Sequence, residues 1–341
     1  MKLLLTFMAM IASVASLPVD TNVTLERIAY GSCAGMLGKT AYIYKDIADY
    51  SPQAWFWLGD VAYVDNFPWG PTEDRDEVQR RFNVQKYDKN YQRILANSQV
   101  TGIWDDHDYN QNDGTKYNPT KDWVKDIFLN FLDEPKDSPR WDRDGLYTSY
   151  VYGLGKKTVK LIFLDVRYNA DYPDEPNADQ LGENQWKWLE EEVANDTATF
   201  TLVVAGIEVL PDDRIIQNML YPSTRERLFT LLGKYQLPGV VILSGDIHVA
   251  IALESPCPMF GMKYKAYEFT SSGLSHTIAD HFPAPFWAYE AFFPPTWPAS
   301  DMYVIENFAS IEFDWNNEAD PSLTVDFRTL GNRVLHSRTL H

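Results

Sequence analysis

Cysteine is scarce in this chain, which contains only Cys33 and Cys257 among its 341 residues. At most one disulfide bond can therefore form, and most of the stability has to come from a hydrophobic core. Aromatic residues make up 14% of the sequence, including 11 Trp, and they can supply a well-packed core. Pairing of the two cysteines is one expectation for an oxidising compartment. A disulfide would, however, prevent Cys33 from acting as a free thiol.

Basic residues are also few, with 30 Lys and Arg against 48 Asp and Glu, so the formal net charge is −18. This charge repels a phosphate backbone, and nucleic acid is therefore not an expected partner. The sequence has no internal repeat or low-complexity tract, and no transmembrane segment is predicted after the N-terminal residues. It also lacks the Gly-x-Ser-x-Gly pattern of serine hydrolases, so a serine nucleophile has no support.

The N-terminus has the features of a cleavable signal peptide. The basic Lys2 precedes a short apolar run over residues 3–14, which ends in two small residues. This order predicts a signal peptide at residues 1–16 and a secreted protein formed by residues 17–341 as a single domain. The alternative is a buried N-terminal helix. Two glycosylation sequons, which are compatible with a secretory route, begin at Asn22 and Asn195.

Most of the chain alternates short apolar runs with helix-like segments. Strands are predicted at Leu25–Tyr30, Ala54–Leu58, Val100–Trp104, Thr158–Leu164, Thr199–Ala205 and Gly239–Leu243. Helices are predicted at Ala41–Asp49, Asp74–Ala96, Trp123–Leu132, Glu183–Val193 and Thr224–Tyr235. Continuous apolar strands separated by amphipathic helices are typical of an α/β fold with mostly buried strands.

The last fifty residues follow a different pattern. Phe308–Asp314 and Leu323–Thr329 alternate apolar with polar residues, and a Gly331-Asn332 turn signal precedes Arg333–Leu335. These segments are predicted antiparallel strands that complete a sheet. Before them, His281–Pro298 is rich in proline and aromatic residues. This loop is interpreted either as a lid packed on the core or as an apolar wall beside a substrate.

Polar residues that can carry chemistry follow five of the predicted strands. In chain order they are Gly31-Ser32-Cys33, Gly59-Asp60 with Tyr63 and Asp65, Asp105-Asp106-His107-Asp108, Asp165-Val166-Arg167-Tyr168, and Ser244-Gly245-Asp246-Ile247-His248. The carboxyl ends of strands in open α/β sheets converge on the ligand crevice. We therefore expect these residues to meet at one edge of the sheet.

The acidic residues among these strand ends indicate a cation. Carboxylates crowded together repel one another, and a multivalent cation is the simplest compensation. Gly59 and Gly245 fit tight turns that let the backbone approach such a cation closely. A single aspartate after a strand is often only the cap of the next helix. The metal-site interpretation therefore depends on the whole cluster.

In combination, these motifs resemble the PhoD-like alkaline phosphatases of the calcineurin-like metallophosphoesterase superfamily. The matching stretches lie within roughly residues 28 to 276 and include Leu58-Gly59-Asp60-Val61-Ala62-Tyr63, Trp104-Asp105-Asp106-His107-Asp108-Tyr109 and Ser271-Ser272-Gly273-Leu274-Ser275-His276. The resemblance implies a metallophosphoesterase-type, four-layer αββα sandwich with C-terminal antiparallel strands. It also implies a phosphatase that uses two or more metal ions.

The resemblance further implies a set of metal ligands, namely Cys33, Asp60, Tyr63, Asp106, Asp246 and His248. Asp60 occupies the position of a carboxylate that bridges two metals, and Asp105 is the alternative to Asp106. The thiolate and phenolate imply Fe(III), while the more oxygen-rich part of the set suits Ca(II). A disulfide between Cys33 and Cys257 would remove the thiolate, so the two expectations exclude each other.

Three more residues match positions that handle the substrate. His107 corresponds to a histidine that steadies the phosphoryl group or protonates the leaving oxygen. Arg167 and Asn112 are candidates for holding phosphate oxygens. The alternatives are a structural ion pair for Arg167 and a turn position for Asn112. The sequence departs from the family at Glu208, where glutamine is usual, and Glu208 is left out of the ligand set.

The predicted function is a secreted metal-dependent phosphoesterase that cleaves phosphate monoesters, diesters or both. In the implied mechanism, a hydroxide that bridges two metals attacks phosphorus in line. One alternative is a phosphodiesterase with phospholipase D-type action on phospholipid head groups. The other is a secreted binding protein without catalysis. The presence of Asp60, His107 and His248 disfavours that last alternative.

Overall fold

The computed structural model describes residues 14–35, 40–212, 219–237, 240–285, 288–289 and 302–341. The predicted signal peptide lies outside the described residues except for its last three positions, and so does most of the predicted aromatic loop at 281–298. No helix in the described ranges has the length and apolar character needed to cross a bilayer.

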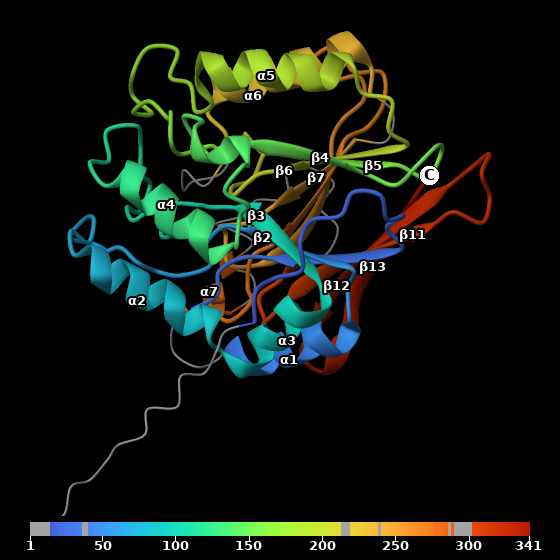
Figure 1. Cartoon of the computed structure of the whole chain (residues 1–341). Helices are drawn as coiled ribbons and strands as arrows, with labels where there is room; N and C mark the ends of the chain where they lie inside the picture. Colours follow the sequence, from blue (N-terminus) through green and yellow to red (C-terminus); the bar gives the residue numbers. More distant parts are fainter. Residues whose placement is uncertain (1–13, 36–39, 213–218, 238–239, 286–287, 290–301) are drawn as a thin grey trace, which may run out of the picture.

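Two mixed β-sheets form the centre of the molecule within the described residues (Figure 1). The first sheet has the order β13-β12-β11-β1-β2-β3. Its strands are β1 (Arg27–Gly31), β2 (Ala54–Leu58), β3 (Gln99–Ile103), β11 (Phe308–Asp314), β12 (Ser322–Thr329) and β13 (Arg333–Leu340). The first three strands are parallel to one another. Strand β11 pairs antiparallel with β1, and β12 and β13 extend the sheet as antiparallel neighbours. The predicted C-terminal hairpin is therefore confirmed.

The second sheet has the order β10-β8-β9-β7-β6-β5-β4. Its strands are β4 (Thr148–Tyr152), β5 (Val159–Phe163), β6 (Phe200–Val204), β7 (Val240–Ser244), β8 (Ala250–Glu254), β9 (Tyr267–Ser271) and β10 (Met302–Tyr303). Strands β5, β6, β7 and β9 are parallel neighbours. Parallel strands of this kind are buried on both faces, which explains the mainly apolar sequences of β6 and β7.

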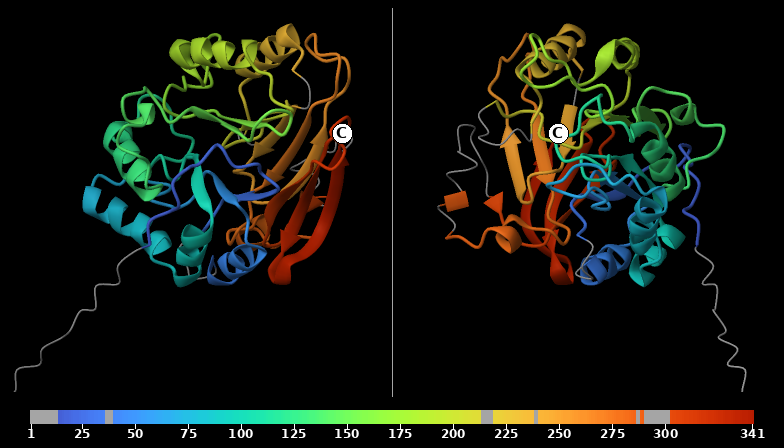
Figure 2. Two further views of the ribbon diagram at one scale, coloured as in Figure 1. Left: turned by 45° about the vertical axis from the view of Figure 1, so that its right-hand side comes forward. Right: turned by 90° about the vertical axis from the view of Figure 1, so that its left-hand side faces the viewer.

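Helices cover the outer faces of the two sheets (Figures 1 and 2). Helices α5 (Gly182–Ala194) and α6 (Pro222–Tyr235) lie over the second sheet, and α1 (Thr40–Tyr50) and α3 (Lys89–Asn97) lie under the first. The remaining helices are α2 (Arg75–Lys86), α4 (Lys121–Phe131) and α7 (Ile278–His281). This arrangement confirms the predicted four-layer αββα sandwich.

The alternation of side chains along β2 shows how the layers are joined. The ring of Phe56 contacts Phe163 of β5 in the other sheet, with 5.7 Å between ring centroids. The next residue, Trp57, points to the opposite face and packs on Tyr44 of α1 and Tyr91 of α3. Successive side chains of a strand point to opposite faces. One face of β2 therefore fills the space between the sheets, and the other supports the helices.

Two features of the fold differ from the sequence predictions. The predicted helix Asp74–Ala96 is broken into α2 and α3, because the Asp88 side chain accepts hydrogen bonds from the N–H groups of Asn90 and Tyr91 and so begins a new helix. Strands β4, β8, β9 and β10 were also not predicted. Three of these four lie beyond β7 in the second sheet, where β9 contains the polar residues Glu268, Thr270 and Ser271 and β10 has only two residues.

Candidate metal centre

The five strands with polar tips belong to two sheets, so the prediction that they meet at the edge of a single sheet is wrong. Strands β1, β2 and β3 come from the first sheet, and β5 and β7 from the second. Gly245 lies where the two sets of strand ends meet. A Cβ atom at Gly245 would lie 2.5 Å from the carbonyl oxygen of Leu58 and 2.6 Å from Oγ of Ser32. Glycine is therefore needed for this close approach of β7 to β2.

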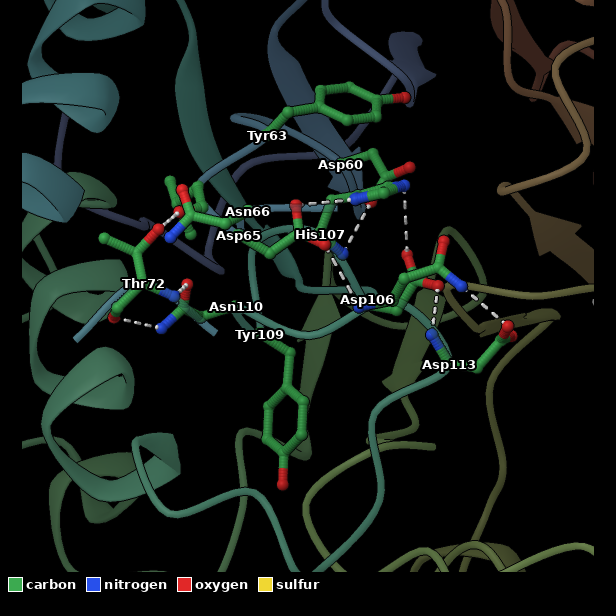
Figure 3. Close-up of polar contacts among 12 residues, drawn as sticks. Asp60, Tyr63, Asp65, Asn66, Thr72, Asp106, His107, Tyr109, Asn110 and Asp113 are labelled. Atoms are coloured by element: carbon green, nitrogen blue, oxygen red, sulfur yellow. Dashed lines mark hydrogen bonds and ion pairs between the residues drawn. The ribbon is translucent and has the colours of Figure 1, made fainter. Parts of the chain in front are cut away.

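The tips of these strands bring the predicted metal ligands together. Three overlapping groups have ligand atoms within 4.8 Å of one another, namely Cys33 with Asp60 and His248, Asp60 with Asp106 and His107, and Asp105 with Asp106 and Asp246. Asp60 belongs to two of the groups and Asp106 to two, so the three form one continuous cluster. Figure 3 shows part of this cluster, with Asp60 and Asp106 next to His107.

Tyr63 and Cys33 complete one end of this cluster. The Tyr63 hydroxyl lies 3.4 Å from Nε2 of His248, and Cys33 Sγ lies 3.6 Å from Oδ2 of Asp60. Cys33 is buried and Cys257 is exposed, and both thiols are free. The expected disulfide is therefore absent, and the Cys33 thiol remains available to a metal.

Four of the proposed ligands have an unusual backbone conformation. The φ angles of Cys33, Asp60, Asp246 and His248 are 61°, 52°, 73° and 60°. Residues other than glycine enter this left-handed region at a cost of order 1–3 kcal/mol each, and they cluster at functional sites. The concentration of four such residues in one cluster indicates that the fold maintains these turns to aim the side chains.

The carboxylates of the cluster are crowded. Burial raises the pKa of Asp60 to about 8, and the charges of Asp106 and Asp105 add to this increase. Burial also raises the pKa of Asp246 well above its usual value, again with Asp105 and Asp106 contributing. For Asp106, the charges of His107 and Arg167 outweigh burial and lower the pKa. Without a further cation, the protein cannot keep all of these groups ionised together.

Arg167 supplies a counter-charge for only part of the cluster. Its Nε lies 2.6 Å from Oδ1 of Asp105 and its Nη2 3.1 Å from Oδ2, which is a bidentate ion pair. Asp106 is farther away, with 3.7 Å between its Oδ2 and Nη2 of Arg167. The bidentate pair engages both oxygens of Asp105, whereas Asp106 keeps one oxygen without a hydrogen-bond partner in the described ranges. Both residues belong to the third ligand group, so the choice of Asp106 over Asp105 as the ligand stays a prediction. This ion pair agrees with the structural role that was the alternative for Arg167 in the sequence analysis. A contact between Arg167 and a phosphate oxygen stays a prediction.

The donor set fits a cation. Among the described residues, Oδ1 of Asp106 and Oδ2 of Asp246 are buried without a hydrogen-bond partner. A buried carboxylate oxygen without a partner is costly. Hard cations bind such oxygens, whereas the nearby thiol, phenol and imidazole of Cys33, Tyr63 and His248 are ligands for a transition metal. The residues present are therefore compatible with bound metal ions.

His107 is held at the edge of the cluster by Asp65. Its Nδ1 lies 2.9 Å from Oδ1 of Asp65, and its Nε2 lies 4.0 Å from Oδ1 of Asp106 (Figure 3). Burial lowers the pKa of His107, but the charges of Asp106, Asp60 and Asp65 outweigh burial and raise it to about 11. Asp65 follows Tyr63 by two residues in the sequence, where its spacing was visible but its role was not assigned.

Asn112 lies outside the cluster of ligand atoms. Its backbone N–H donates to Oδ2 of Asp65 at 3.1 Å, and its side-chain amide donates to Oδ2 of Asp113 at 2.7 Å. These contacts match the turn position that the sequence left open. A role in holding phosphate oxygens stays a prediction for Asn112.

His276 joins the site although no role was assigned to it from the sequence. Its ring centroid lies 4.5 Å from that of Tyr63 and 4.5 Å from that of His248. The backbone of its loop is tied to the end of β1, because the Ser275 N–H donates to the Cys33 oxygen at 3.2 Å. The motif that ends in His276 was visible in the sequence, but only the fold brings it to Cys33.

We expect replacement of Asp65 by Asn to lower kcat by about 10- to 100-fold, because a carboxylate that orients a functional imidazole contributes an effect of that size. Metal content should be unchanged, since Asp65 belongs to none of the three ligand groups. Steady-state kinetics and elemental analysis of the purified variant measure both quantities. Asp137→Asn, an exposed substitution, is the control. Equal losses of metal and activity would show that Asp65 acts on the metals instead.

Two further buried acids, Glu208 and Glu268, lie close enough to interact electrostatically. Glu208 and Glu268 are both fully buried, and the Glu268 carboxylate accepts the N–H groups of Val209 at 2.9 Å and Leu210 at 2.6 Å. Burial, followed by the charge of Glu208, raises the pKa of Glu268 to about 7. The proximity of Glu208 to Glu268 is compatible with leaving Glu208 out of the ligand set.

This raised pKa predicts a pH-dependent stability. When folding raises the pKa of a carboxyl group, that group stabilises the folded state fully at pH values below its pKa in the unfolded chain. This contribution is lost as the pH rises through the pKa in the folded state. Between pH 5 and pH 8 the wild type should therefore lose stability relative to the Glu268→Gln variant. The difference in the free energy of unfolding, variant minus wild type, should increase by up to about 3 kcal/mol. Urea unfolding at the two pH values measures this difference. If the stability difference between variant and wild type is the same at both pH values, the raised pKa of Glu268 is contradicted.

Comparison with known proteins agrees with this geometry. A family model described as PhoD-like phosphatase matches residues 28–284. No curated protein matches the chain significantly. A solved structure described as that of PhoD is 18% identical, with a TM-score of 0.70, and the match covers 95% of this chain and 70% of that one.

The purple acid phosphatase PPD1 from seeds of yellow lupin (Lupinus luteus) is 13% identical, with a TM-score of 0.62. The match covers 94% of this chain and 55% of the lupin chain, so this protein spans about half the length of that relative. At these identities, the two structures show a shared fold. The family match covers far more than half of the chain and confirms the resemblance seen in the motifs. The protein therefore belongs to the PhoD-like phosphatase family and is a phosphatase that acts on phosphate esters.

Proposed function

We propose that this phosphatase is secreted and hydrolyses phosphate monoesters or diesters with two or more metal ions bound at the strand tips. The observation that carries the proposal is the buried cluster of carboxylate oxygens, two of them without a hydrogen-bond partner in the described part of the chain, beside His107. The proposed ligands are Cys33, Asp60, Tyr63, Asp106, Asp246 and His248.

The chemistry of the side chains supports Fe(III) and Ca(II) as the metals. The thiol of Cys33 and the phenol of Tyr63 lie on the side of His248, whereas Asp106 and Asp246 offer only oxygens. Asp60 lies between the two sides and can contribute an oxygen to each. When bound, the metals would act as Lewis acids and lower the pKa of the attacking water.

The chain's own groups provide the other elements of catalysis. His107 projects at the edge of the cluster, and the Asp65 carboxylate fixes the orientation of its ring, so that Nε2 faces the cluster. We assign to this nitrogen the proton that the leaving oxygen receives. Arg167 and Asn112 remain candidates for contacts to the phosphate oxygens, with Arg167 limited by its ion pair to Asp105.

Chelation is the first test of the proposal. Exhaustive treatment of the purified protein with a chelator should abolish the hydrolysis of a chromogenic phosphate ester, and the addition of Fe and Ca salts should restore it. A parallel comparison of monoesters with diesters, including a phospholipid, identifies the bond that is preferred. Full activity in metal-free protein would refute the proposed mechanism.

The proposal of secretion rests on the sequence of the first 16 residues and on exposed sequons. Both Asn22 and Asn195 lie on the surface, where glycosylation enzymes can reach them. Expression of the full chain in a eukaryotic cell should yield protein in the medium that begins at residue 17. N-terminal sequencing measures this directly, and retention of an uncleaved chain inside the cell would contradict it.

A further inference from the structure

The loop that follows β2 carries two exposed aromatic residues, and one of them contacts His107 of the metal centre. Phe67 is 63% exposed and Trp69 is 87% exposed, whereas Phe56 of β2 is fully buried. The ring of Phe67 meets His107 edge to face, with 6.1 Å between ring centroids. Single exposed apolar residues are common on protein surfaces. Phe67 and Trp69 are two large apolar side chains within three positions, and Phe67 contacts His107, the proposed general acid. This combination indicates a binding role.

The tip of this loop has a defined turn. The N–H of Asn66 donates to the oxygen of Gly70 at 2.9 Å, and the N–H of Trp69 donates to the oxygen of Asn66 at 2.6 Å. These two bonds close the segment that carries Phe67 and Trp69. The rings therefore project from a hydrogen-bonded turn.

Both ends of the loop are also held by side chains. Arg81 of α2 donates from Nη1 to the oxygen of Asp65 at 2.9 Å. At the other end, the side-chain amide of Asn110 accepts the N–H of Thr72 and donates to the oxygen of Thr72, each at 2.9 Å (Figure 3). Because both ends are fixed, the turn that carries Phe67 and Trp69 keeps its place next to His107. A binding surface that is already ordered loses little conformational entropy when a ligand arrives.

We propose that Phe67 and Trp69 form a subsite for an apolar or aromatic organic group of the phosphate ester, on the leaving-group side. The inference rests on the proposed function, in which His107 protonates the leaving oxygen. The carbon bonded to that oxygen then lies next to His107, and therefore next to Phe67. Trp69 extends the same apolar surface outward, so a ring or alkyl chain on the ester is buried against both side chains.

The charge of the protein favours a substrate group over a membrane as the occupant. Exposed Trp and Phe also occur on proteins that insert into a lipid interface, usually together with basic residues. Here the net charge is −18, which opposes approach to an anionic bilayer. The contact between Phe67 and His107 places the aromatic surface at the reacting group instead.

The test compares two ligands that differ only in their organic group. Phenylphosphonate and methylphosphonate carry the same anionic head and are not esters, so calorimetry can follow their binding to the metal-loaded protein without turnover. We expect the wild type to bind phenylphosphonate about tenfold more tightly, as one good aromatic contact provides. Trp69→Ala should remove most of this preference, and Phe67→Leu should reduce it.

Leu154→Ala is the matched control. Leu154 is 70% exposed and lies in the turn between β4 and β5, at the opposite end of β5 from the site. Its removal should leave the preference for phenylphosphonate unchanged. Kinetics with hexyl phosphate and ethyl phosphate, two esters with the same type of leaving group, should show the same pattern in kcat/KM.

Several results would overturn the subsite. Equal binding of the two phosphonates by the wild type would do so, and so would an unchanged preference in Trp69→Ala. Binding to phosphatidylcholine vesicles that requires Trp69, without any phosphonate preference, would assign the loop to a membrane surface. Failure of the proposed function is distinguishable, because metal-loaded wild type would then hydrolyse neither ester, whatever its preference between the phosphonates.

Discussion

Asp60→Asn is expected to lower kcat/KM by at least about 10³-fold, because it removes the carboxylate that is shared by two of the ligand groups. The purified variant should also contain less metal than the wild type when both are measured by elemental analysis. Asp137→Asn, on the exposed surface, removes one acid without touching the cluster and should change neither quantity.

The same substitution should stabilise the metal-free protein at high pH. The raised pKa of Asp60, about 8, means that its stabilising contribution is lost as the pH rises through that value. At pH 9 the metal-free wild type therefore carries a buried carboxylate that the Asn variant lacks, and the variant should melt at a higher temperature. Metal addition should reverse the order, because binding stabilises only the protein that retains the site. A metal-free variant that melts below the wild type at pH 9 would contradict the crowding of charges.

His107→Gln is expected to lower kcat by about 10²- to 10⁴-fold, which is the range for loss of a positioned general acid. His107 belongs to one ligand group, but its Nδ1 is engaged by Asp65 and the group keeps Asp60 and Asp106, so metal content should fall far less than kcat. Esters with acidic leaving alcohols need less protonation and should be affected less than alkyl esters. The loss of kcat for alkyl esters divided by the loss for esters with acidic leaving alcohols measures proton donation by His107.

Two outcomes would exclude His107 as the acid. An equal loss for aryl and alkyl esters would indicate a role in binding the phosphoryl group instead. Loss of metal from the variant would show that His107 is a ligand. Asp65→Asn should shift the same ester ratio in the same direction by a smaller amount, because it affects only the position of the ring.

The elements that the sequence predicted well are those in which local pattern and burial agree. Strand β2 was predicted to the residue because Ala54–Leu58 is apolar throughout, and β11 because Phe308–Asp314 alternates. Strand β9 was missed because it contains Glu268, an acid inside a buried strand. The N–H groups of Val209 and Leu210 satisfy that acid, and they come from a loop about 60 residues earlier in the chain. A local pattern cannot show such a partner.

The candidate site also contains features that the sequence predicted and features that depend on the fold. The residue types at the strand tips indicated a metal, and the structure brings Cys33, Asp60, Asp106, Asp246 and His248 together. The sequence could not show that the tips come from two sheets, nor that Arg167 is already paired with Asp105. Both depend on how the two sheets pack. The exposure of Phe67 and Trp69 could not be predicted either, because it depends on how the loop after β2 folds against its neighbours.

The proposed metal centre can be tested by a crystal structure of the metal-loaded protein, with anomalous diffraction data collected at the iron edge and at a wavelength sensitive to calcium. We predict one iron peak at Cys33, Tyr63 and His248 and a calcium peak at Asp106 and Asp246, with Asp60 between them and all bonds within about 2.0–2.6 Å. Metal bound at other residues, or no metal at these strand tips in an active enzyme, would contradict the account.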